Sequence, residues 1–207
     1  MADIVYVLTN ESMPGLVKIG RTTTSIEQRI KQLDTTSVAL PFQCFYAAEV
    51  ADCVFVESKL HIAFAHTRVR LNREFFRIDA TQAAAAVQLA ALKDVTPKND
   101  VVNDASDSQA MVAAVEKAER RARLKFSALG IPTGAVLTFA KDTSITCVVV
   151  GDGQVNYDGE TLSSSASALK AIRKLGYNWS AVSGSDLWMY EGETLVARRE
   201  RLEVDGG

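Results

Sequence analysis

The segment IVYVLTNESMPGLVKIGR, residues 4–21, sets the architecture of the first half of this chain. It contains two short apolar runs, at 3–9 and 16–20, with the turn signal Pro14-Gly15 between them. Apolar runs on either side of a Pro-Gly turn predict a β-hairpin. Such a hairpin brings Tyr6 and Lys18 near the same point, so the segment also contains the first candidate functional residues.

The residues that follow predict two helices and a third strand. Ser25 suits a helix N-cap, and the apolar spacing after it predicts a helix through Leu33. The run 41–50 is typical of a strand, and Asp52 suits the cap of the next helix. A closing segment at 75–78 completes an antiparallel sheet flanked by helices.

Five polar residues stand at positions that this fold can bring together. Tyr6 and Lys18 lie on the hairpin, Arg29 lies on the first helix, and Glu57 and His61 lie four residues apart on the second. Residues at this spacing share a helix face. A tyrosine, two cations, a carboxylate and a histidine are the groups needed to cut a phosphodiester with one metal ion.

The ordered set resembles the GIY-YIG nuclease superfamily, in its T5orf172/MUG113-like branch, over about residues 3–80. The first family motif falls on 4–6 and the second on 18–20, and the family's helical arginine and glutamate fall on Arg29 and Glu57. The run Asn-Arg-Glu-Phe-Phe at 72–76 is similar to the ending of this branch. The second motif has Lys18 where the wider superfamily has tyrosine.

The resemblance implies a role for each residue. Glu57 would bind Mg²⁺ or Mn²⁺, and Arg29 would contact the scissile phosphate. Tyr6 and Lys18 are both candidates for the general base, and this choice stays open. His61 could contact phosphate, transfer a proton or orient the water. The plain alternatives are a packed strand tyrosine, an exposed edge lysine, a solvated helix arginine, a surface glutamate and a half-buried histidine.

DNA contacts are expected from cationic and polar residues in the same half of the chain. The net charge of −2 argues against a protein that coats DNA nonspecifically, although charge can be local. The expected DNA-binding residues are Arg21, Arg70, Asn72 and Arg73.

The middle of the chain predicts a linker and a connecting helix. A helix from about 81 to 92 is followed by a polar segment at 94–108, which is a linker by composition. The helix predicted at 109–126 has a stripe of Met111, Val115, Ala118 and Ala122. The stripe suits packing on the second domain, the favoured interpretation, or the seam of a homodimer. The predicted domains are 1–93 and 127–207, joined by 94–126.

Residues 127–207 predict a second small domain. Strands are expected at 135–139 and 146–150, with a turn at 151–153 and a helix opened by the serine run at 163–167. These elements predict a small antiparallel sheet that packs against one helix. The fold class of the whole chain is therefore α/β in the broad sense, specifically α+β.

This second half resembles the RAMA/DUF4357 family, which is fused to DNA-modification and restriction enzymes. The matching features are Gly134 before a strand, the turn at 152–153, the serine run and the later tryptophans. The resemblance implies recognition of modified double-stranded DNA. The residues expected to contact DNA are Ser163, Ser164, Ser165, Trp179, Trp188 and Tyr190, with a hydrophobic core as the alternative for the aromatic ones.

The composition limits the remaining choices. The chain has 207 residues, 47% of them hydrophobic, and three cysteines without metal-ligand spacing. No apolar run approaches the roughly 18 residues of a membrane span, and no secretory signal is recognised, so a cytoplasmic protein is expected. The sequence predicts a metal-dependent DNA endonuclease of the restriction type. The alternatives are a catalytically weak DNA-binding regulator and a structure-specific repair or recombination nuclease.

Overall fold

A computed structural model describes residues 3–122 and 125–205, although not the side chains of 118–122 and 204–205. The chain divides into two compact units, Met1–Met111 and Val112–Gly207. Both are α+β units built on an antiparallel sheet, so the expected fold class is confirmed. No helix among the described residues is long and apolar enough to span a membrane.

The first unit has a five-stranded sheet in the order β4-β2-β1-β3-β5. Every pairing in it is antiparallel. Its elements, in chain order, are β1 (Ile4–Thr9), β2 (Val17–Thr22), α1 (Ile26–Leu33), β3 (Gln43–Glu49), α2 (Cys53–Ala63), a 3-10 turn (Ala65–Thr67), β4 (Phe75–Phe76), α3 (Ala80–Gln88) and β5 (Lys93–Asp94). The expected caps are confirmed, because Ser25 accepts a hydrogen bond from Gln28 N and Asp52 accepts one from Phe55 N.

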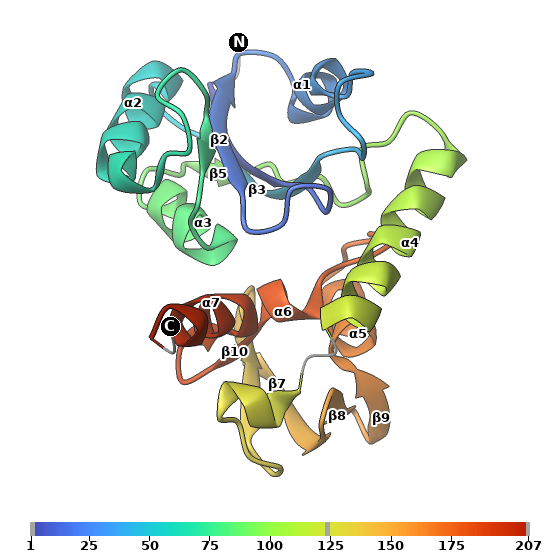
Figure 1. Ribbon diagram of the computed structural model, residues 1–207. Coiled ribbons are helices and arrows are strands. Elements are labelled where there is room, and N and C mark those ends of the chain that lie inside the picture. The colour runs from blue at the N-terminus through green and yellow to red at the C-terminus, as the bar shows by residue number, and fades with distance from the viewer. Residues whose placement is uncertain (1–2, 123–124, 206–207) are drawn as a thin grey trace. The chain divides into compact units, whose positions relative to one another are not determined.

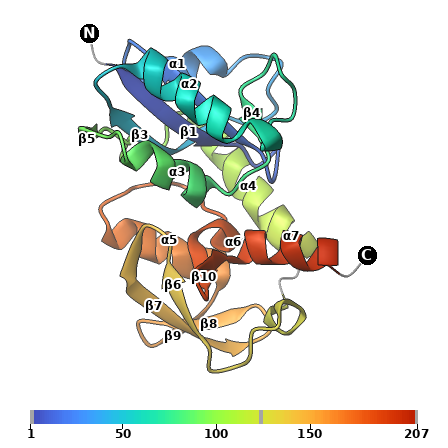
Figure 2. The same cartoon turned by 90° about the vertical axis from the view of Figure 1, so that its left-hand side faces the viewer.

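Helices cover both faces of this sheet (Figures 1 and 2). Successive strand residues point to opposite faces. Tyr6 and Leu8 of β1 therefore share a face, and they pack with Ile26 and Ile30 of α1 in one buried cluster. The other face is covered by α2 and α3, which contact β2 and β1.

The predicted linker at 94–108 begins inside the first unit. Strand β5 pairs with β3, and Thr96 accepts a hydrogen bond from Ala47 N at 3.0 Å. Val95 and Val101 pack against the core of the sheet. The polar composition of this segment reflects an edge strand and its turns, so composition alone places the end of the first unit too early.

Helix α4 (Ala105–Ala122) follows and crosses the boundary between the units. It starts four residues earlier than expected from the sequence, where Asp104 accepts hydrogen bonds from the backbone of Ser106 and Asp107. Met111 and Val115 of the predicted stripe are buried. The side chains of Ala118 and Ala122 lie outside the described residues, and a homodimer stays a prediction.

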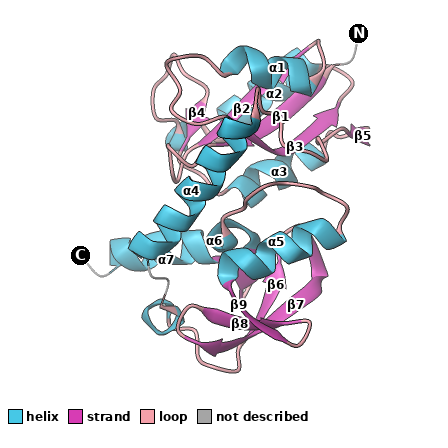
Figure 3. Cartoon of the chain, turned by 90° about the vertical axis from the view of Figure 1, so that its right-hand side faces the viewer, coloured by secondary structure: helices cyan, strands magenta, loops and turns pink. Residues whose placement is uncertain are grey.

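The second unit has a six-stranded sheet in the order β11-β10-β6-β7-β8-β9. Strands β6 to β9 of this sheet are labelled in Figure 3. Its elements, after a 3-10 turn (Phe126–Leu129), are β6 (Val136–Phe139), β7 (Asp142–Gly151), β8 (Gln154–Tyr157), β9 (Glu160–Ser163), α5 (Ser164–Lys174), α6 (Gly184–Leu187), β10 (Trp188–Tyr190), β11 (Glu193–Thr194) and α7 (Leu195–Asp205). The expected strands and the serine-capped helix are present.

The second unit contains more structure than the sequence predicts. The hairpin β8–β9 turns at Asp158-Gly159, where both residues have positive φ, at 50° and 82°. Aspartate and glycine tolerate this conformation, which two-residue hairpin turns require. Helices α6 and α7 were not expected either. The short α6 has no extended apolar pattern of its own and is specified by tertiary contacts with α5.

Candidate functional site

Tyr6 lies at the centre of the first unit's sheet. Its side chain is fully buried, and its hydroxyl oxygen accepts a hydrogen bond from Nε of Arg29 at 3.2 Å. Tyr6 pairs directly with Gly20 across the two strands. A Cβ atom at position 20 would lie 2.6 Å from the Tyr6 hydroxyl oxygen, which is closer than real contacts allow. The glycine of the second motif therefore makes the space that the tyrosine ring fills.

The surroundings of Tyr6 keep its hydroxyl protonated. Burial raises the pKa of Tyr6, and the negative charges of Glu74 and Glu57 raise it further, whereas the hydrogen bond and charge of Arg29 lower it. The net direction is upward from 10.0. A phenol in this state can orient a water molecule or donate to an oxygen, but it is a poor proton acceptor near neutral pH.

Lys18 is buried rather than exposed, because β2 is covered at its outer side by β4. Its ammonium group pairs with the carboxylate of Glu74 and lies over the ring of Phe75, 5.5 Å from the centroid. The exposed edge-strand alternative for Lys18 is therefore wrong. The structure gives Lys18 a carboxylate partner, Glu74.

Glu74 is the residue of this site that sequence reasoning missed. Burial tends to raise its pKa, but the hydrogen bond and charge of Lys18 outweigh burial, with smaller contributions from His61 and Arg29, so the pKa lies below 4.5. Three cationic or basic groups from three elements thus act on one carboxylate. The available signal was its position beside Asn72 in the family's ending motif, directly before a strand.

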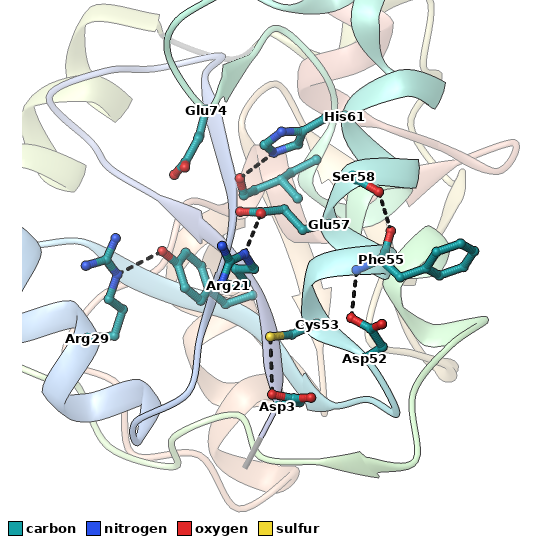
Figure 4. Close-up of polar contacts among 12 residues, drawn as sticks. Asp3, Arg21, Arg29, Asp52, Cys53, Phe55, Glu57, Ser58, His61 and Glu74 are labelled. Carbon is teal, nitrogen blue, oxygen red and sulfur yellow. Dashed lines mark hydrogen bonds and ion pairs between the residues drawn. The ribbon is translucent and has the colours of Figure 1, made fainter. Parts of the chain in front are cut away.

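Glu57 and His61 both face β2 from helix α2, as their spacing predicts (Figure 4). The Glu57 carboxylate accepts a hydrogen bond from Nε of Arg21 at 2.9 Å, and its side chain is only 15% exposed. Nε2 of His61 lies 3.0 Å from the carbonyl oxygen of Ile19. A carbonyl can only accept, so Nε2 carries the proton and Nδ1 is the acceptor nitrogen of a neutral His61.

The donor set suits a hard divalent ion only in part. No group of three or more His, Cys, Asp and Glu side chains gathers anywhere in the described part of the chain. One carboxylate, with waters and phosphate oxygens completing the shell, is nevertheless a common way to hold Mg²⁺. Glu57 fits that description, and its pairing with Arg21 leaves one carboxylate oxygen without this arginine contact.

The expected DNA contacts of the first unit lie on the loop that leads into Glu74. Arg70, Asn72 and Arg73 are all exposed there. The loop is held by Arg68, whose Nε donates to the carbonyl of Arg73 at 2.6 Å. Arg21 has a different position, because it is engaged by Glu57.

The serines of the second unit hold the fold together. Ser163 caps α5 by accepting from Ala166 N at 3.2 Å, as expected for one serine of the run. Ser165 accepts from Gly184 N at 2.9 Å, and a Cβ at Gly184 would lie only 2.3 Å from the backbone of Ser164. These contacts fix α6 against α5. The buried Ser164 and Ser165 therefore do not face an incoming phosphate.

Trp188 belongs to the core of the second unit. It is fully buried, and its Nε1 donates to the carbonyl of Ser164 and to Oγ of Ser167, both at 3.0 Å. Its ring packs against Phe139 and Tyr157. Of the two alternatives for this residue, the structure supports the core and corrects its assignment as a surface for bases.

The other two aromatic candidates are also engaged. Trp179 is 3% exposed, and the ammonium group of Lys141 lies 5.2 Å from its ring centroid. Tyr190 is half-buried, with the guanidinium group of Arg198 4.9 Å from its ring centroid. The three aromatic residues therefore do not form one exposed stacking platform.

Comparison with known protein families gives a match within the first unit. Residues 3–91 match the T5orf172 domain, which belongs to the GIY-YIG-like endonuclease superfamily. No curated protein matches the chain. No solved structure matches it either. Residues 3–91 are thus similar to a nuclease-type domain, whereas the RAMA/DUF4357 resemblance of residues 127–207 stays a prediction.

Proposed function

We propose that this chain is a metal-dependent DNA endonuclease and that its first unit hydrolyses the DNA backbone. The observation that carries the proposal is the grouping of Tyr6, Arg29 and the Lys18–Glu74 pair around strands β1 and β2. The carboxylate of Glu57 acts electrostatically on the same tyrosine. The match of residues 3–91 to a nuclease-type domain supports the same conclusion.

The side chains divide the work of the reaction. Arg29 uses Nε to hold the Tyr6 hydroxyl and has further N–H groups for the scissile phosphate, where charge builds in the transition state. Tyr6, protonated at rest, orients the attacking water. When bound at Glu57, Mg²⁺ or Mn²⁺ supplies Lewis-acid stabilisation of the developing charge.

A restriction role is the finer part of the proposal. In that setting the second unit selects DNA that carries a modified base, as its resemblance to the RAMA/DUF4357 family implies. The exposed residues of the second unit, rather than Trp188, would then make the contacts. The assay that addresses this part compares cleavage of unmodified, methylated and hydroxymethylated duplexes and of branched DNA, because a repair nuclease would prefer the branched substrate.

One observation favours the second candidate, a catalytically weak DNA-binding regulator. The Glu57 carboxylate is already engaged by Arg21, so a metal ion must share it with a cation. A regulator of this kind would bind DNA without cutting it under any metal condition.

The test of the proposed function is cleavage of labelled duplex DNA by the full chain with Mg²⁺ and with Mn²⁺. The Glu57→Gln variant should cut at least about a hundredfold more slowly, because it loses the carboxylate charge while keeping the side-chain shape. Glu27→Gln, at an exposed carboxylate on α1, is the matched control and should cut like the wild type. Equal rates for the two variants would remove Glu57 from the site.

A further inference from the structure

Lys18 is the one charged residue that the structure buries within the described part of the chain. Its side chain is 8% exposed, whereas that of its partner Glu74 is 38% exposed. A buried charge is stable only when it is paired and hydrogen-bonded. The charged Lys18 ammonium group is therefore buried, and its partner Glu74 is partly exposed to solvent.

The backbone fixes Glu74 beside Lys18. The carbonyl of Glu74 accepts from Ile19 N at 3.1 Å, next to Lys18 in β2. The following residue, Phe75, pairs in register with Lys18, and its ring lies beneath the ammonium group. Lys18 thus has a carboxylate on one side and an aromatic face on another, both supplied by one short segment.

We propose that Glu74 is a positioning residue that keeps Lys18 as a charged phosphate contact, which excludes Lys18 as the general base. The inference rests on the proposed function and assigns a role within the same site. An ammonium group has three N–H donors, so the bond to Glu74 leaves two for the oxygens of a DNA phosphate. An amine that must accept a proton needs a setting that lowers its pKa, such as a neighbouring cation and no carboxylate partner.

Other charged groups surround this pair. Arg29 approaches from α1 and His61 from α2, and both act on the Glu74 carboxylate. Tyr6 of β1 and Glu57 of α2 belong to the same group of side chains, because the charges of Glu74 and Glu57 both raise the pKa of Tyr6. Glu74 is the only one of these groups that forms an ion pair with Lys18 in the described structure. Loss of its carboxylate would leave the ammonium group buried without a counter-ion.

The first experiment measures DNA binding without metal. The full chain and its Glu74→Gln, Lys18→Arg and double variants are titrated into a fluorescent duplex in EDTA, from about pH 6 to pH 9. Relative to wild type, E74Q should bind normally at the acid end and lose about tenfold in affinity at the alkaline end, because an unpaired buried lysine gives up its proton more easily. The double variant should show no pH-dependent loss beyond that of Lys18→Arg alone, because arginine stays charged throughout this range.

Affinities of E74Q that run parallel to those of the wild type at every pH would overturn the proposal. The exposed-carboxylate variant Glu27→Gln is the control and should follow the wild type throughout. A wild-type chain that binds no DNA at any pH would instead refute the proposed function itself.

The second experiment follows single-turnover cleavage with Mg²⁺ or Mn²⁺. Lys18→Arg should keep cleavage within about tenfold of wild type, because arginine supplies the charge but cannot serve as a base. Loss of all cleavage in K18R, or faster cleavage in E74Q at neutral pH, would make Lys18 the base and overturn the proposal. K18R alone decides this point if E74Q does not fold. A wild-type chain that binds DNA but never cuts it refutes the nuclease function, while the binding experiment still tests Glu74.

Discussion

Tyr6 and Gly20 face each other across β1 and β2, and the tyrosine ring occupies the space that a side chain at position 20 would need. The Tyr6 hydroxyl oxygen accepts a hydrogen bond from Nε of Arg29, 3.2 Å away. Two residues from separate sequence motifs therefore form one packed unit. The position of the hydroxyl depends on the glycine as much as on the tyrosine.

Gly20→Ala should consequently destabilise the first unit by about 1–3 kcal/mol and slow cleavage, because the added methyl group overpacks a filled site. The free energy of unfolding comes from urea titrations followed by circular dichroism. Gly151→Ala is a suitable control, because its Cβ would meet only the side-chain oxygen of Gln154 at 3.8 Å. Similar stability losses in both variants would show that glycine flexibility, rather than the Tyr6 contact, is responsible.

Helix α2 shows how one element can deliver two functional groups. Its cap at Asp52 fixes where the first turn begins, and the spacing of four residues then turns Glu57 and His61 to the same strand. On β2, Arg21 bonds to Glu57, and the carbonyl of Ile19 bonds to His61. The helix is therefore anchored to the sheet through the same side chains that are proposed to act on DNA.

Helix α5 has a structural role in the second unit. Ser165 holds the start of α6, and Ser167 with the Ser164 carbonyl holds the indole of Trp188. The serine run suits this task because each hydroxyl can reach a backbone or side-chain group within the same short segment. The start of α5, which the serine run predicts to be a phosphate-binding site, is thus used for internal packing.

Trp188→Ala should destabilise the second unit by about 3–5 kcal/mol, because it removes a large side chain from a filled core. Ser167→Ala should cost about 1 kcal/mol, because Trp188 keeps its bond to the Ser164 carbonyl. Both tryptophans of the chain lie in the second unit, so fluorescence of Trp179 during urea unfolding reports on that unit. A stable Trp188→Ala variant that had lost DNA binding would instead return this residue to a recognition role.

At the scale of the whole molecule, the charge is nearly balanced, with 23 basic and 25 acidic residues. DNA binding must therefore depend on where the basic groups gather. Two arginines of the first unit already have partners within the fold: Arg21 pairs with Glu57, and Arg68 donates a hydrogen bond to the Arg73 carbonyl. The side chains of Arg70 and Arg73 are exposed on the loop before β4.

Arg70→Ala and Arg73→Ala should each weaken binding to DNA of any sequence, because they remove phosphate contacts. Each should also reduce the slope of log affinity against log salt concentration by about 1. Lys93→Ala is the control, because β5 lies at the opposite edge of the sheet from β4. Affinities are measured by fluorescence anisotropy at several salt concentrations. An unchanged slope in both arginine variants, or an equal change in Lys93→Ala, would show that this loop does not contact the phosphates.

Local sequence signals account for much of the first unit. The Pro-Gly turn, the caps Ser25 and Asp52, and the four-residue spacing of Glu57 and His61 each act over a few residues, and all of them are found as expected. Tyr6 and Arg29 were likewise candidates from their motifs, and the structure joins them by a hydrogen bond. Such features can be read from the chain because their physical cause is short-range.

Long-range contacts account for what the sequence did not reveal. The Lys18–Glu74 pair joins residues 56 positions apart, and Thr96 completes a core bond to Ala47 across 49 positions. The burial of Trp188 depends on serines more than twenty positions away. A single sequence shows that a lysine, a threonine or a tryptophan is present, but its burial and its partner are fixed only when distant segments pack together, because desolvation and pairing are properties of the assembled surroundings.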